Sequence, residues 1–173
     1  MKKLLLPFFF IGSMAMIFVM TKTGATLKTP TTPMGILDLE FAYNTTKTTT
    51  VLNAWAPTSD TNNIAAARIN TYWDFLFLFF YAGFLFLACN KIASSISGPV
   101  ERAGKLIAKA ALLAGFLDII ENTGMLLTLN DKGSSAIAFC TTFTSIIKWG
   151  LALIAVLYVL TGLLVLAYRR IKY

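Results

Sequence analysis

Trp149–Tyr168 has the sequence WGLALIAVLYVLTGLLVLAY and contains no charged residue. A helix of about 20 apolar residues crosses the ~30 Å hydrocarbon core of a bilayer, and Trp and Tyr are enriched where such helices meet water. The stretch therefore predicts a membrane-spanning helix. The composition agrees, because 57% of the 173 residues are hydrophobic and only 13% are charged, whereas soluble domains are about a quarter charged.

Three earlier segments have the same apolar character: Leu4–Met20, a helix from about residue 61 to 91, and about 110–129. Together with Trp149–Tyr168 they predict an all-α membrane protein, a four-transmembrane-helix bundle. Leu4–Met20 follows two lysines, which is also the pattern of a secretory signal peptide. We expect a first transmembrane helix over residues 1–20, with a signal peptide as the alternative.

The net charge of +7 is concentrated in three clusters that flank the apolar segments. Because cytoplasmic loops carry an excess of Lys and Arg, the clusters predict cytoplasmic N- and C-termini and a multi-pass protein of the bacterial inner membrane. A nucleic-acid partner is not expected, since no basic surface with a recognition motif appears. The clusters are Lys2 and Lys3; Lys91, Arg102, Lys105 and Lys109; and Arg169, Arg170 and Lys172.

This topology places residues 21–72 outside the cytoplasm, ahead of a three-helix transmembrane core at 73–173. Residues 21–33 are rich in Thr and Pro and predict an extended linker. The stretch ILDLEF at 36–41 alternates apolar and acidic residues and predicts a short strand or amphipathic edge. Residues 45–55 fit either a helix or a strand. We expect this segment to form a small extracytoplasmic cap, followed by an extension of the second helix.

The sequence FLDIIENTG at 116–124 places three polar residues in the third apolar segment. Asp118, Glu121 and Asn122 have the spacing i, i+3 and i+4, which puts them on one side of a helix. Small residues precede them on that side, and such faces let helices approach closely. The polar side is therefore predicted to face protein rather than lipid, where an acid is costly.

Lys148 is the expected counter-charge of this patch. It lies about as far after the turn near residues 130–135 as Asp118 lies before it, so either Asp118 or Glu121 can pair with it. One acid then remains, which must be protonated, hydrogen-bonded to Asn122, a Thr or a Tyr, or solvated in a cavity. Asp74 is another acid near the outer end of the second span. It is either an exposed interfacial residue or part of an outward-facing polar cavity with Glu121 and Lys148.

Catalysis is not expected from these residues. The chain has no histidine, which excludes imidazole-based nucleophile systems and proton relays. Asp118 and Glu121 share one helix and are poorly placed as an acid–base pair, and the depths inferred for Asp74 and Asp118 differ. The motifs of the four-span lipoprotein signal peptidases are absent. The sequence predicts no catalytic residue, no metal site and no cofactor.

The run from ILDLEFA at residue 36 to AGFLDIIEN at 114–122 resembles a group of small, uncharacterised bacterial membrane proteins with four spans. Their pattern is LDxxFLxxY in the second span and AGxxDxxEN in the third. The resemblance covers roughly residues 36–160, and Trp73 stands where the pattern has leucine before Asp74. It implies the four-span topology and points to Asp74, Asp118, Glu121 and Asn122, but it implies no reaction.

Two functions follow as expectations. The first is a non-catalytic accessory or assembly module, whose partners are the lipid bilayer, other membrane subunits or further copies of itself. The second is binding or translocation of a lipid, small amphiphile, cation or proton at Asp74, Asp118, Glu121, Asn122 and Lys148. A sealed and fully paired polar network would favour the first function, and open access to Asp118 would favour the second.

Overall fold

The computed structural model describes residues 2–57 and 62–172, and every regular element within them is helical. The four long helices are α1 (Lys2–Thr23), α4 (Asn63–Ala93), α5 (Pro99–Leu129) and α6 (Ser135–Lys172). Three short helices separate α1 from α4 in the sequence: η1 (Ala25–Leu27), α2 (Ile36–Glu40) and α3 (Thr45–Ala54).

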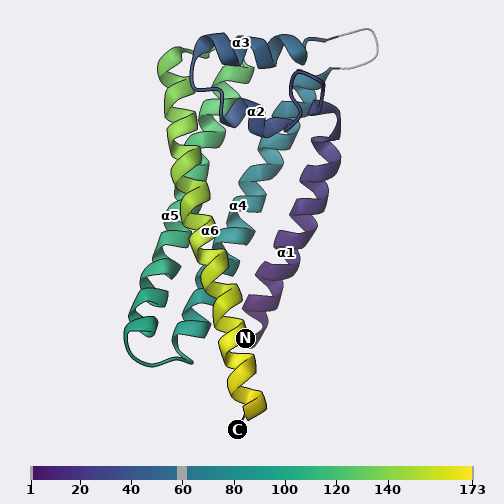
Figure 1. The fold of residues 1–173 in the computed structure, drawn as a ribbon. Helices are drawn as coiled ribbons and strands as arrows, with labels where there is room; N and C mark the ends of the chain where they lie inside the picture. Colours follow the sequence, from purple (N-terminus) through teal and green to yellow (C-terminus); the bar gives the residue numbers. More distant parts are fainter. Residues whose placement is uncertain (1, 58–61, 173) are drawn as a thin grey trace.

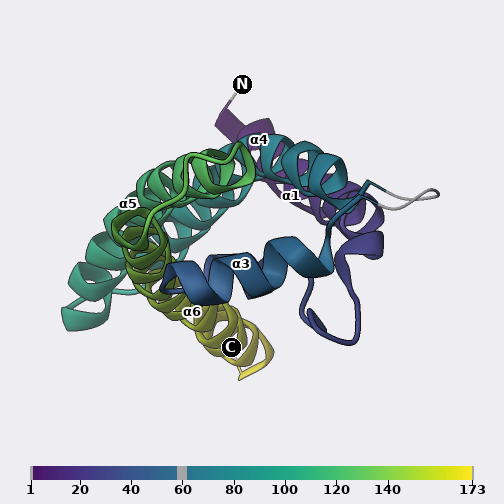
Figure 2. The ribbon, with the colours of Figure 1, turned by 90° about the horizontal axis from the view of Figure 1, so that it is seen from above.

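The four long helices run side by side, and both chain termini lie at the end opposite α2 and α3 (Figure 1). We call residues 25–54, which contain the three short helices, the cap. α1 packs against α4, α4 packs against α5 and α6, and α5 packs against α6. Viewed from above, the long helices follow one another along an arc and α3 crosses its open side (Figure 2). α1 and α6 therefore form the two edges of the arc.

Three helices in the described part of the chain are long and apolar enough to cross a membrane. They are α1 over Leu4–Thr23, α4 and α6, and they agree with three of the four predicted spans. α5 contains the other predicted span, between α4 and α6. It carries the polar patch and, near its start, Glu101, Arg102, Lys105 and Lys109.

The small residues of α5 face neighbouring helices, as the sequence predicted, and Gly115 makes a close contact with α4. Ala108, Ala111 and Ala114 have no exposed surface. A Cβ added at Gly115 would lie 2.8 Å from the Cβ of Ala82, which is closer than two carbon atoms pack. The two helices can approach to this distance only because Gly115 has no side chain. The polar patch, which continues on the same side of α5, is thereby directed into the protein.

α1 joins the bundle through aromatic side chains. The ring of Phe9 lies 5.2 Å from that of Phe79, and the ring of Phe10 lies 5.2 Å from that of Phe84, measured between centroids. Gly83 of α4 leaves the space that the Phe9 ring occupies. Because this contact is made with α4, the face of α1 that looks toward α6 is not packed against α6.

The cap is fixed over the ends of α4 and α5 by Trp55. This side chain is fully buried, and its Nε1 donates hydrogen bonds to the Leu27 carbonyl at 2.9 Å and to Thr32 Oγ1 at 3.1 Å. Burying an indole with its N–H paired combines a large apolar area with a satisfied donor. The apolar core around it contains Leu27, Leu39, Val51, Ala67, Met125 and Leu129.

Of the two alternatives for residues 36–41, the strand is wrong, because Ile36–Glu40 form the helix α2. Gly35 has a φ of 67° and turns the chain into this helix. The adjacent residues Leu39 and Glu40 are both buried, whereas neighbours on a strand point to opposite faces. The helix therefore directs Leu39 into the cap core and Glu40 toward the bundle. Residues 45–54, for which both structures were considered, are also helical.

A second apolar core lies toward the other end of the bundle, between α4, α5 and α6. It contains Leu85, Ala88, Cys89, Ile92, Ala108, Ala111, Ala155 and Val159. On each of these helices the buried charged residues lie between this core and the cap end. The bundle thus has two apolar cores separated by a polar layer, which contains the candidate site.

Candidate functional site

Lys148 is the centre of the polar layer. Its Nζ donates hydrogen bonds to Asp118 Oδ1 at 3.0 Å and to Glu121 Oε1 at 2.8 Å. All three residues are at least nine-tenths buried. The pairing that the turn geometry predicted between α5 and α6 is thus present, and Lys148 reaches both acids. A buried ammonium with two carboxylate partners is held far more rigidly than an exposed ion pair.

Glu40 of the cap also reaches this centre, which the sequence reasoning missed. Its Oε2 lies 3.7 Å from Lys148 Nζ and accepts hydrogen bonds from Ser145 Oγ at 3.0 Å and Trp149 Nε1 at 3.2 Å. The Glu40 carbonyl accepts a further bond from Thr142 Oγ1. The cap is therefore attached to α6 at the site itself. The one sequence signal that could have pointed to Glu40 is that it is an acidic residue between Leu39 and Phe41, in a segment with few charged residues.

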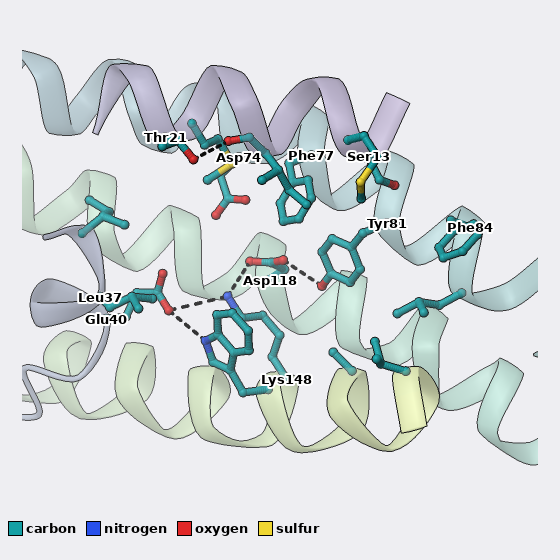
Figure 3. Close-up of a pocket in the computed structure, with 18 residues that line it drawn as sticks. Ser13, Thr21, Leu37, Glu40, Asp74, Phe77, Tyr81, Phe84, Asp118 and Lys148 are labelled. Carbon is teal, nitrogen blue, oxygen red and sulfur yellow. Dashed lines mark hydrogen bonds and ion pairs between the residues drawn. The ribbon is translucent and has the colours of Figure 1, made fainter. Parts of the chain in front are cut away.

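Tyr81 of α4 forms a hydrogen bond with the second carboxylate oxygen of Asp118. Its hydroxyl donates to Asp118 Oδ2 at 2.8 Å, while Asp118 Oδ1 faces Lys148 (Figure 3). Both carboxylate oxygens are thus engaged. An acid–base pair for hydrolysis needs two carboxylates that face one water molecule, and this geometry does not favour such a role for Asp118.

Asp74 is not the exposed interfacial acid that was one of its two interpretations. Its side chain is 5% exposed and lines the same cavity as Asp118 and Lys148. In Figure 3, Asp74 projects from α4 toward the centre of the cavity and no dashed line reaches its carboxylate. Helical periodicity could not show this burial, because it depends on how α4 packs against the other long helices.

Two other polar groups of the layer lack partners within the described residues. Glu121 Oε2 and both amide atoms of Asn122 are buried without a hydrogen bond. The amide of Asn122 lies beside Asp74 and acts on its carboxylate as a weak donor, although no atom of the amide attains full hydrogen-bond geometry. Of the alternatives expected for the surplus acid, its exposure to a cavity is the one that Asp74 clearly fits. Buried groups without partners are rare in proteins, and each one asks for an explanation such as a bound water or ligand.

A cavity of about 480 Å³ adjoins this polar layer, between α1 and α6 and beneath α2. Its polar end is formed by Glu40, Asp74, Asp118 and Lys148. Its walls are otherwise almost entirely apolar and continue toward the second core, and they include Met14, Ile17, Phe77, Phe84, Leu85, Ala152 and Val156. Ligand pockets have this volume and this combination of an apolar lining with a few convergent polar groups.

Comparison with protein families, with characterised proteins and with solved structures finds no match for this chain. The assignment of the site therefore depends on its own geometry. The structure brings together Asp74, Asp118 and Lys148 from the predicted set and adds Glu40 to them at the cavity. Glu121 and Asn122 lie behind them in the same polar layer.

Proposed function

We propose that this is a membrane protein with four spans, whose cap faces away from the cytoplasm. α1, α4 and α6 have the length and composition of spans, and α5 is packed between α4 and α6. The basic clusters on these helices lie toward the end opposite the cap (Figure 1), which is the cytoplasmic end by the positive-inside rule. A bacterial inner membrane is the location that this proposal includes.

Within that membrane, we propose that the protein binds one lipid or small amphiphile in the cavity between α1 and α6. The observation that carries this proposal is the cavity's division into a charged end under the cap and a long apolar part. An amphiphile would place its head at the polar layer and its chain beside Ala152 and Val156.

An accessory or assembly module is the second candidate. Most of the apolar surface of α1 and α6 is not buried within the chain, and this surface fits a partner subunit as well as lipid. The open cavity beside Asp118 favours ligand binding, since a purely structural polar network needs no such access. Native mass spectrometry after gentle extraction tests both candidates, because it reports bound lipids and partner subunits together.

Filling the cavity is expected to abolish amphiphile binding. In Ala152→Phe, the added ring occupies the apolar part of the cavity beside Val156, so the alkyl chain loses its space. We expect the fraction of protein that retains a bound lipid in native mass spectra to fall at least about tenfold, because overlap between the ring and the alkyl chain costs more than about 1.4 kcal/mol.

Ala167→Phe is the matched control. Ala167 is exposed on the same helix and does not line the cavity, so the same change there should leave lipid retention at the wild-type level. Equal retention by wild type and Ala152→Phe would contradict the proposed function.

A further inference from the structure

The polar end of the cavity has more carboxylates than its single ammonium group can serve. Lys148 donates to Asp118 and Glu121 and also lies near Glu40, so its three N–H groups already face three acids. Asp74 is the fourth acid of the layer. Within residues 2–57 and 62–172 it forms no ion pair, and Lys148 is the one basic residue paired with any of these acids. Asp74 is therefore the one acid of the layer that has no ion pair within the described residues.

Asp74 is also the acid that a ligand can reach. It is 95% buried by the surrounding helices, yet it lines the cavity and accepts no hydrogen bond from the other residues that line it. A buried carboxylate without a counter-charge is strongly unfavourable, and it takes up a proton unless a cation replaces its lost hydration. A group that enters the cavity with both a positive charge and N–H donors would replace that hydration. A quaternary ammonium group has the charge but not the donors.

The shape of the cavity indicates what this cation is attached to. No group of three acid, Cys or His side chains in the described part of the chain is arranged as metal ligands. The space next to Asp74 continues along Phe77, Phe84 and Val156, whose side chains offer an ion no ligands. These walls match an alkyl chain, and the polar end matches its head group.

We infer that the cavity selects amphiphiles whose head is a protonated amine with N–H donors, and that Asp74 binds this head. The inference depends on the proposed function and specifies its ligand. The amine nitrogen takes the place beside Asp74 that no protein cation fills. Tyr81 and Lys148 hold Asp118 in place next to it. The chain extends from the amine along the apolar wall, away from the cap.

Trp149 provides the measurement, because it lines the cavity and is 40% exposed. The protein is placed in phosphatidylcholine nanodiscs and titrated with brominated stearylamine, brominated stearyl alcohol or brominated stearic acid, which quench nearby tryptophan. The signal of Trp149 is the difference between each protein and its Trp149→Phe counterpart. We expect the amine to quench at a concentration about ten- to a hundredfold lower than the alcohol, as a charge-assisted hydrogen bond implies. The acid should be the weakest.

Asp74→Asn should remove the preference for the amine and leave quenching by the alcohol unchanged. Asp131→Asn is its control, because Asp131 is exposed in the turn between α5 and α6, at a φ of 59° that asparagine also adopts. It should behave as wild type does. Equal quenching of the wild type by all three probes would overturn the amine inference while leaving amphiphile binding intact. Quenching by none of them above the level in Ala152→Phe would overturn the proposed function as well.

Discussion

Lys148→Met is expected to lower the free energy of unfolding by about 3–5 kcal/mol, as the removal of one partner from a buried ion pair does. The substitution leaves Asp118, Glu121 and Glu40 next to one another without their shared ammonium group. Methionine fills a similar volume, so the loss of stability measures the effect of the missing charge rather than a change in packing. The measurement is an unfolding titration with sodium dodecyl sulfate in mixed micelles.

Lys105→Met is the matched control for this change. Lys105 pairs with Glu101 one helical turn away, and its side chain is 57% exposed. Exposed pairs contribute about 0–1 kcal/mol, so the same substitution there should have little effect. A loss of stability in Lys105→Met as large as in Lys148→Met would show that the polar layer has no special role.

The double variant Asp118→Asn with Lys148→Met tests the pair itself. Neutralising Asp118 removes one of the unpaired charges that Lys148→Met creates, so the double variant should recover part of the lost stability. Residues in direct contact show coupling energies of about 0.5–3 kcal/mol. Strict additivity of the two single effects would contradict a direct interaction between Asp118 and Lys148.

Gly115→Val is expected to destabilise the protein by about 1–3 kcal/mol or more, because overpacking a close helix contact has at least this cost. The valine Cβ would lie 2.8 Å from the Cβ of Ala82, and neither helix backbone can move without disturbing the apolar core beside it. The same unfolding titration measures the change.

Gly150→Val is the control for the close approach. A Cβ at Gly150 meets no atom within 4 Å, and α6 continues on both sides of it. Valine should be neutral or slightly stabilising there, since glycine is a poor residue in a helix interior. If the two substitutions had equal effects, the contact between α4 and α5 would not depend on the small side chain at residue 115.

The polar patch was predictable because its geometry is local. Helical periodicity places Asp118 and Glu121 on one side of α5, and the short turn before α6 sets Lys148 at a similar depth. Glu40 could not be placed in this way. Its position depends on the turn at Gly35 and on a hydrogen bond to Thr142, which is 102 residues away in the sequence.

The burial of Asp74 and the cavity itself could not be predicted from the sequence, for a related reason. Both depend on how α1 is positioned, and α1 packs against α4 but not along α6. An apolar helix with many similar phenylalanines can be rotated about its axis without a clear change in its pattern. The sequence of α1 therefore predicted a membrane span, but it did not predict which face of the helix is directed toward the cavity.

If the proposed amphiphile binds in the cavity, the open side of the arc between α1 and α6 determines the route by which it arrives. An amphiphile that passes between these two helices moves sideways from the surrounding lipid and never has to leave it for water. Its search for the site is then two-dimensional. Occupancy follows the mole fraction of the amphiphile within the membrane, and an apparent affinity expressed as an aqueous concentration would change with the amount of lipid in the assay.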